Sequence, residues 1–266
     1  MNRNLLFGCL AAASLAATGA ATAATPEGTT PQTRLYGAPD QPNISGIWFP
    51  GNIQRPAPNG RGTGFGSLAP LWGIGDPPLK GAYLKLYEKY TAAANAGKPY
   101  ADTASECKAL GVPRVLFGPD PMEIIQTPGQ ITMIQETGHE VRRIYTDGRA
   151  QATDPDPWFD GHNVGHWEGN VLVVDVVGLR ADTAMDAAET PHSDALLVTE
   201  RWILKGPNDI EVDAVASDPK AFTHPWTAKY YWQRGDADYE MLEDVCEDNN
   251  RNITNPDGTQ STILGK

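Results

Sequence analysis

Histidines near residues 160–170 are the side chains of this sequence best suited to proton transfer. That stretch reads DGHNVGHWEGN and holds His162 and His166, two of the five histidines, while His192 follows in a PHSD run. An imidazole changes its charge near neutral pH and also serves as a metal ligand. We therefore place the candidate site at His162 and His192, and predict that they exchange protons with a bound substrate.

Carboxylates and a phenol are the predicted partners of these histidines. Glu168, Glu200 and Tyr145 would share the proton transfer or orient the imidazoles. Arg149 follows an Asp-Gly pair, where it would hold an anionic or carbonyl oxygen or, in a plain hairpin turn, lie in solvent. The predicted substrate-binding residues are Arg149, Trp167, Asp160 and Trp226.

Two other kinds of chemistry need residues from separate loops. A metal site would require His162, His192 and either Asp160 or Glu168 to converge, because no HExxH or HxH run is present. Ser193 lies in no GxSxG elbow, so a Ser–His–Asp group would have to assemble from distant positions. The sequence favours a site with no metal and no cofactor.

The N-terminus has the pattern of an export signal. Arg3 precedes an apolar stretch, and small residues around Ala23 form a cleavage pattern. We expect residues 1–23 to be removed and the mature protein to be periplasmic or secreted, without membrane insertion. The net charge of −12 and the pI near 4.8 argue against a nucleic-acid partner.

Two cysteines, Cys107 and Cys246, remain after such cleavage. An even pair in an exported protein predicts a disulfide bond. A catalytic or metal-binding pair is the alternative, although neither residue lies in a CxxC or CxxH spacing.

The elements that must position the site are mainly strands. Residues 24–77 are rich in Gly and Pro and predict an extended arm with one strand-like piece at 44–49. Residues 78–96 repeat apolar side chains at three- and four-residue steps, which predicts a helix, and a short second helix would follow near Asp102. From Met122 the period changes to two. The expected strands cover 122–126, 131–136, 140–145, 171–177, 195–204, 209–216, 228–234 and 239–246.

Tight Gly, Pro, Asn and Asp turns separate several of these strands, as in antiparallel hairpins. The expected domain, residues 78–266, is therefore an antiparallel meander that closes into a lipocalin-like barrel or a strongly curved sandwich. In strand 195–204 one face carries Glu200 and the other Arg201. A charge must therefore point inward, whichever face lines the interior. Such a charge indicates a paired structural network or a polar ligand cavity.

An ordered series of motifs covers most of the mature chain. In chain order they are ISGIW, IIQTPG, RIYTDGR, GHNVGHWEGN, PHS and CEDNN. This series resembles a family of exported bacterial proteins common in sphingomonads and acidobacteria. The resemblance implies a shared fold and a shared site near His162 and His192, and it implies no particular reaction. Position 166 varies in that family, which weakens His166 as an essential ligand.

Proton transfer without a cofactor defines the first functional hypothesis. It is a lyase or isomerase, possibly a hydrolase, that acts on a small organic molecule such as a phenolic, a terpenoid or a glycoside. A lipocalin-like protein that only binds such a compound is the alternative, because a fold does not determine a function. A metal-dependent hydrolase is the third hypothesis.

Overall fold

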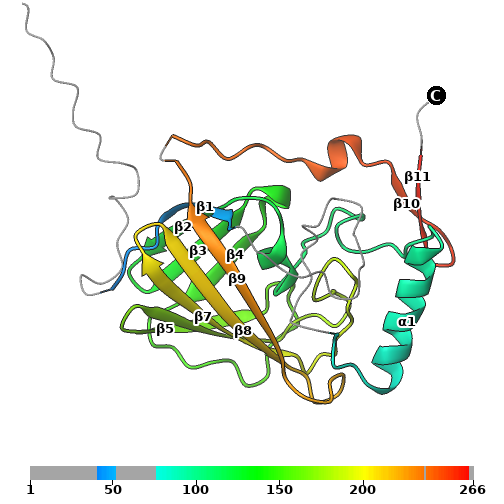
Figure 1. The fold of residues 1–266 in the computed structure, drawn as a ribbon, viewed down its shortest axis with the longest axis horizontal. Helices are drawn as coiled ribbons and strands as arrows, with labels where there is room; N and C mark the ends of the chain where they lie inside the picture. Colours follow the sequence, from blue (N-terminus) through cyan, green and yellow to red (C-terminus); the bar gives the residue numbers. More distant parts are fainter. Residues whose placement is uncertain (1–40, 52–75, 237, 264–266) are drawn as a thin grey trace, which may run out of the picture. The chain divides into compact units, whose positions relative to one another are not determined.

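Nine strands close into one barrel in the computed structural model, which describes residues 41–51, 76–236 and 238–263 (Figure 1). The predicted signal peptide, most of the predicted arm and the last three residues lie outside this described part. The barrel strands are β1 (Gly46–Pro50), β2 (Met122–Thr127), β3 (Gln130–Gln135), β4 (Val141–Tyr145), β5 (His162–Glu168), β6 (Val171–Val177), β7 (Leu197–Gly206), β8 (Asp209–Ser217) and β9 (Trp226–Arg234).

Strands that follow one another in the chain are neighbours in the barrel, and β9 closes the ring by pairing with β1. The prediction of a β-rich, lipocalin-like barrel is confirmed. One strand pair departs from the antiparallel meander: β4 and β5 run parallel, and Ile144 pairs with Asn163. Residues 146–161 separate these strands, a length that allows the chain to return to the same end of the barrel before it re-enters the sheet.

Several predicted segments differ from the structure by more than the one- or two-residue shifts seen at strand ends. The strand-like piece within the predicted arm is β1, a full member of the barrel. The histidine-containing run after Gly161 is itself strand β5. Residues 239–246, predicted as a strand, are not part of the sheet, and Tyr239 Oη donates to Glu136 Oε2 at 2.6 Å.

Side chains that alternate along each strand fill the barrel interior. The largest of them are fully buried: Trp48, Trp202, Trp232 and Tyr230. Gly165 on β5 faces the same core, where a Cβ atom would lie 2.9 Å from Ile144 Cγ2. A larger residue at this position would therefore force β4 and β5 apart.

Helix α1 (Gly81–Asn95) lies outside the barrel sheet (Figure 1). It has no buried residue, although Tyr83 and Tyr87 pack against the core. Leu79 forms a bridge to Phe222 and Lys80 N donates to Ala221 O, which joins the start of the helix to the β8–β9 connection. No helix in the described ranges is long and apolar enough to cross a membrane.

Short elements complete the described chain. The expected second helix is a series of turns after Asp102, followed by the 3-10 helix η4 (Arg114–Phe117). Two further 3-10 helices are η5 (Thr137–His139), between β3 and β4, and η6 (Cys246–Asn249), between β9 and β10. Strands β10 (Asn252–Thr254) and β11 (Gln260–Thr262) form a separate hairpin.

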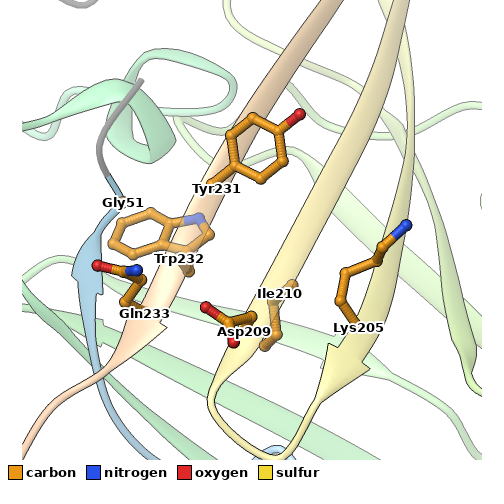
Figure 2. Close-up of a pocket in the computed structure, with 7 residues that line it drawn as sticks. All are labelled: Gly51, Lys205, Asp209, Ile210, Tyr231, Trp232 and Gln233. Atoms are coloured by element: carbon orange, nitrogen blue, oxygen red, sulfur yellow. The ribbon is translucent and has the colours of Figure 1, made fainter. Parts of the chain in front are cut away.

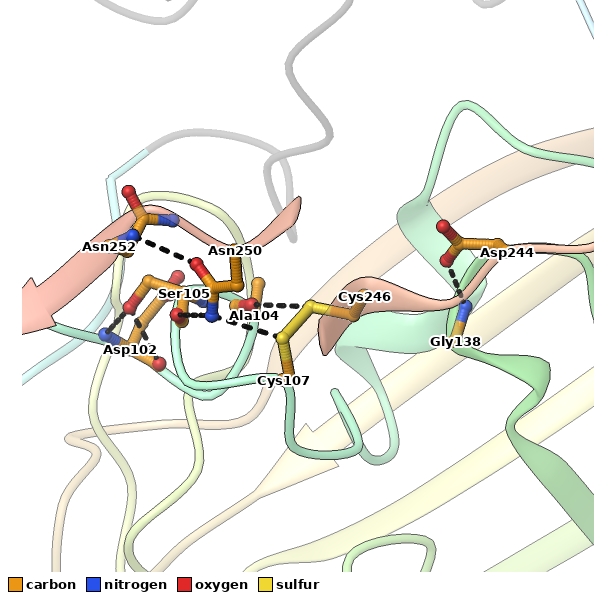
Figure 3. The surroundings of a disulfide bond; sticks show 9 residues. All are labelled: Asp102, Ala104, Ser105, Cys107, Gly138, Asp244, Cys246, Asn250 and Asn252. Carbon is orange, nitrogen blue, oxygen red and sulfur yellow. Dashed lines mark hydrogen bonds between the residues drawn. A yellow bond between two sulfur atoms is a disulfide. The ribbon is translucent and has the colours of Figure 1, made fainter. Parts of the chain in front are cut away.

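A disulfide bond joins Cys107 to Cys246, as predicted (Figure 3). Its surroundings are hydrogen-bonded as well, since Asn250 Nδ2 donates to Ser105 O at 3.0 Å. Farther along the C-terminal segment, Thr254 Oγ1 donates to Glu106 Oε1 at 2.9 Å. The C-terminal segment is therefore tied to the 101–108 turns by a covalent bond and by polar contacts.

Candidate functional site at one end of the barrel

His192 is a buried histidine with both ring nitrogens in contact with oxygen atoms. Its Nε2 lies 3.0 Å from Thr183 Oγ1 and its Nδ1 lies 2.9 Å from Ser193 O. Burial lowers the pKa of His192, so the ring is neutral at neutral pH. Ser193 in turn donates to Asp218 at 2.7 Å. These contacts fix the loop before β7.

His162 lies on the outer face of β5. Its Nε2 lies 2.9 Å from the carbonyl oxygen of Asp156, and its ring stacks on Trp158 at 4.1 Å. No hydrogen bond among the described residues joins His162 to His192. The proposed proton exchange by this pair stays a prediction.

The other predicted site residues fall into two groups, exposed and buried. Glu168 is exposed and accepts a hydrogen bond from Arg201 at 2.9 Å. Arg149 pairs with Asp147 at 2.6 Å and lies over the ring of Tyr145, on the surface. Trp167 packs against the core and Trp226 is buried. Glu200 and Asp160 belong to a buried polar network.

That network crosses the barrel interior between β4, β5 and β7. Arg142 Nη1 lies 3.0 Å from Glu200 Oε2, and Arg142 Nε donates to Asn163 Oδ1 at 2.8 Å. Trp202 Nε1 donates to the same Glu200 oxygen at 2.8 Å. The inward charge that strand alternation predicted is therefore Glu200, and its partner is Arg142.

A pair of carboxyl groups continues the network to the end of the barrel where β4 and β5 begin. Asn163 Nδ2 donates to the backbone oxygen of Asp160 at 2.9 Å. Glu140 accepts the backbone N–H groups of Leu110 and Gly111 at 2.7 and 2.8 Å. Burial, and then the charge of Asp160, raise the pKa of Glu140 to about 8. Glu140 therefore carries a proton at neutral pH.

A second charged cluster lies in the segments that cover this end. Arg114 Nη2 donates to Asp102 Oδ2 at 2.6 Å, and Arg114 is 8% exposed. Burial, and then the charge of Asp102, raise the pKa of Glu189 to about 7, against the opposing effect of Arg114. Unlike Glu140, Glu189 is only partly buried. We call Asp102, Arg114 and Glu189 the end cluster.

Glu189 is held in a strained backbone conformation. Its φ is 58°, a value that residues with a Cβ atom rarely adopt. Asp186 maintains the turn, because its Oδ1 accepts the N–H groups of Ala188 and Thr190 at 3.0 and 3.2 Å. Strain of this kind is found disproportionately at functional sites.

Buried polar atoms without partners lie in the same part of the molecule. Arg114 Nη1, Thr103 Oγ1 and Thr190 Oγ1 have no hydrogen-bond partner among the described residues. Thr103 follows Asp102 in the chain, and Thr190 follows Glu189. A buried polar group without a partner is costly, so each of these atoms calls for an explanation.

The sheet registers show why these groups gather at one end. His162 at the start of β5 pairs with Val177 at the end of β6, and Val176 pairs with Val198 near the start of β7. The loop that holds Glu189 connects β6 to β7, so it emerges at the end where Asp160 precedes β5. Arg114 was missed from the sequence, although a lone cation within the apolar run VPRVLF signals a buried arginine.

No protein-family model, curated protein or solved structure matches this chain. Membership of the sphingomonad and acidobacterial family therefore stays a prediction. Within the ranges that the structure describes, no group of three or more His, Cys, Asp or Glu side chains is arranged to hold a metal ion.

Proposed function

We propose that the protein is an exported acid–base enzyme, and that Glu189 is its base. The observation that carries this proposal is a partly buried glutamate with a pKa of about 7, held in a strained turn near Arg114 and Asp102. A group whose pKa lies near the working pH is populated in both protonation states, which favours proton transfer in both directions. Strongly shifted pKa values also concentrate at active sites.

The reaction class that suits such a base is elimination or isomerisation. The carboxylate of Glu189 would remove a proton from a carbon next to a carbonyl group. The electrons of the broken C–H bond would then enter that carbonyl group or expel a leaving group. Arg114 supplies the positive charge that would stabilise the oxyanion formed, and Asp102 fixes the guanidinium. We expect the substrate to be a small organic molecule.

Mass spectrometry of converted compounds tests this proposal. Wild type and Glu189→Gln would be incubated with plant phenolics, terpenoids and glycosides. A product of unchanged mass indicates an isomerase, and loss of a fragment indicates a lyase. We expect Glu189→Gln to lower kcat/KM about 10²-fold or more, because acid–base catalysis commonly contributes that much. The wild-type rate should rise with pH through about 7, and this inflection should be absent in the variant.

Two further variants make the test specific. Glu88→Gln removes an exposed glutamate of α1 and should leave turnover unchanged. His162→Ala addresses the site predicted from the sequence. The proposal is overturned if His162→Ala abolishes turnover while Glu189→Gln does not, or if compounds bind to the protein and none is converted. The second outcome would identify a carrier.

A further inference from the structure

Residues at the ends of three barrel strands and Gly51 line a pocket of about 240 Å³ (Figure 2). Ile203 near the end of β7 pairs with Val171 at the start of β6, so the β7–β8 turn lies away from the β6–β7 loop. The pocket is formed around the end of β7, the start of β8 and the end of β9. Its lining residues are Gly51, Lys205, Asp209, Ile210, Tyr231, Trp232 and Gln233.

The polar side chains of the pocket combine donors and acceptors without an excess of charge. Asp209 and Gln233 are both exposed and are paired across β8 and β9. Lys205 is the extra residue where the register shifts between Leu204 and Gly206. A bulge of this kind redirects a side chain. Lys205 and Asp209 bring opposite charges, so the pocket favours neither an anion nor a cation.

An aromatic ring completes the pocket. Tyr231 points outward from β9 and is 37% exposed. Gly51 lies against it, because Gly51 N donates to Tyr231 O at 2.7 Å and a Cβ atom on Gly51 would lie 2.9 Å from Tyr231 Cβ. Only glycine permits this approach. The close contact fixes the base of Tyr231 while its ring stays open to a ligand.

We propose that this pocket binds a single neutral sugar ring. A pyranose presents hydroxyl groups that both donate and accept, which Asp209, Gln233 and Lys205 can satisfy, and an apolar C–H face that packs on an aromatic ring. The volume is below the roughly 300–1,000 Å³ of sites for drug-sized ligands, which suits one ring. Because the pocket opens on the outer surface of the strands, the ring can belong to a longer glycan.

Saturation-transfer NMR with methyl glycosides of glucose, galactose, mannose and xylose tests the proposal. We expect at least one glycoside to receive saturation from the wild-type protein. Tyr231→Ala should weaken binding about tenfold or more, as loss of a ring contact worth roughly 1.4 kcal/mol would. Gly51→Ala should weaken binding as well, because the added methyl group displaces Tyr231 and changes no charge.

Trp158→Ala is the matched control, since Trp158 is exposed and lies near the β5 start, at the opposite end. It should leave sugar binding unchanged, and far-UV circular dichroism would confirm that each variant is folded. Absence of saturation transfer to all four glycosides would overturn the proposal. Equal binding by wild type and a folded Tyr231→Ala variant would overturn it too. Neither result depends on the activity assigned to Glu189.

Discussion

Arg142 and Glu200 show what a charge inside this barrel requires. Both side chains are almost completely buried, and each is bonded to a further polar group, Asn163 or Trp202. Removing one member of a buried ion pair leaves an uncompensated charge, which costs about 3–5 kcal/mol. We expect Glu200→Leu to lower the free energy of unfolding by that amount.

Replacement of both residues should be milder than replacement of one. Arg142→Met combined with Glu200→Leu removes both charges of the pair, so part of the lost stability should return. Urea denaturation of wild type, both single variants and the double variant measures this coupling. If the effects of the two single changes add in the double variant, the pair does not act as a unit.

Individual residues mark the limit of what the sequence predicts. Strand alternation indicated that Glu200 or Arg201 must point inward, because side chains on a strand alternate between its faces. It did not identify the partner, since Arg142 lies 58 positions away in the chain. Glu189 was missed for the same reason: its pKa depends on burial and on the charges of Asp102 and Arg114, which only the folded chain brings near it.

At the scale of elements, the long strands were predicted within a few residues and their connections less well. Strand β6 has the predicted bounds because an apolar run ends at tight turns. Strand β5 was harder to recognise, since its glycines and histidines lack β propensity. Packing determines where β5 lies in the sheet, because side chains of β4 and β6 pack directly against Gly165. The parallel β4–β5 pair likewise follows from the path of residues 146–161 and has no local signal.

The disulfide bond between Cys107 and Cys246 stabilises the C-terminal segment against the turns before η4. It spans 139 positions, so in the chain-entropy model its loss lowers the free energy of unfolding by up to about 5 kcal/mol. We expect a Cys107→Ser, Cys246→Ser variant to unfold at lower urea concentration than wild type. A reductant should shift the wild type toward the variant and leave the variant unchanged. Identical urea midpoints for both proteins would contradict a stabilising role.

Considered as a whole molecule, the protein places ionisable groups where folding changes their pKa. Glu140 and Glu189 have pKa values of about 8 and about 7, against 4.5 for an ordinary glutamate. Asp102 behaves oppositely, because Arg114 lowers its pKa despite burial. Groups of the first kind destabilise the fold at high pH, and groups of the second kind destabilise it when they are protonated at low pH.

The sign of the effect follows from which state binds more protons. Below about pH 4.5 each glutamate is protonated in both states, so neither opposes folding. As pH rises, the unfolded chain ionises near 4.5 while the folded protein holds its protons until pH 7 to 8. Unfolding therefore releases protons across this window, and stability falls as pH increases from about 5 to 8. Protonation of Asp102 lowers the stability of the fold below the usual aspartate pKa of 3.8. The protein should therefore be most stable in mild acid.

Replacing Glu140 or Glu189 by glutamine shows how much of the fall in stability between pH 5 and 8 comes from each of these residues. Glu140→Gln is uncharged at every pH and keeps a donor for Asp160, but its single oxygen can accept only one of the N–H groups of Leu110 and Gly111. Urea denaturation from pH 5 to 9 should show a shallower decline in stability for Glu140→Gln than for wild type. Glu189→Gln should make the decline in stability near pH 7 shallower and should also remove turnover. A gain in stability with a loss of activity is expected of a residue that is kept for function. The variant could instead keep both the pH dependence of stability and the turnover of wild type. In that case the carboxyl group at position 189 is ionised across this range and is not the base.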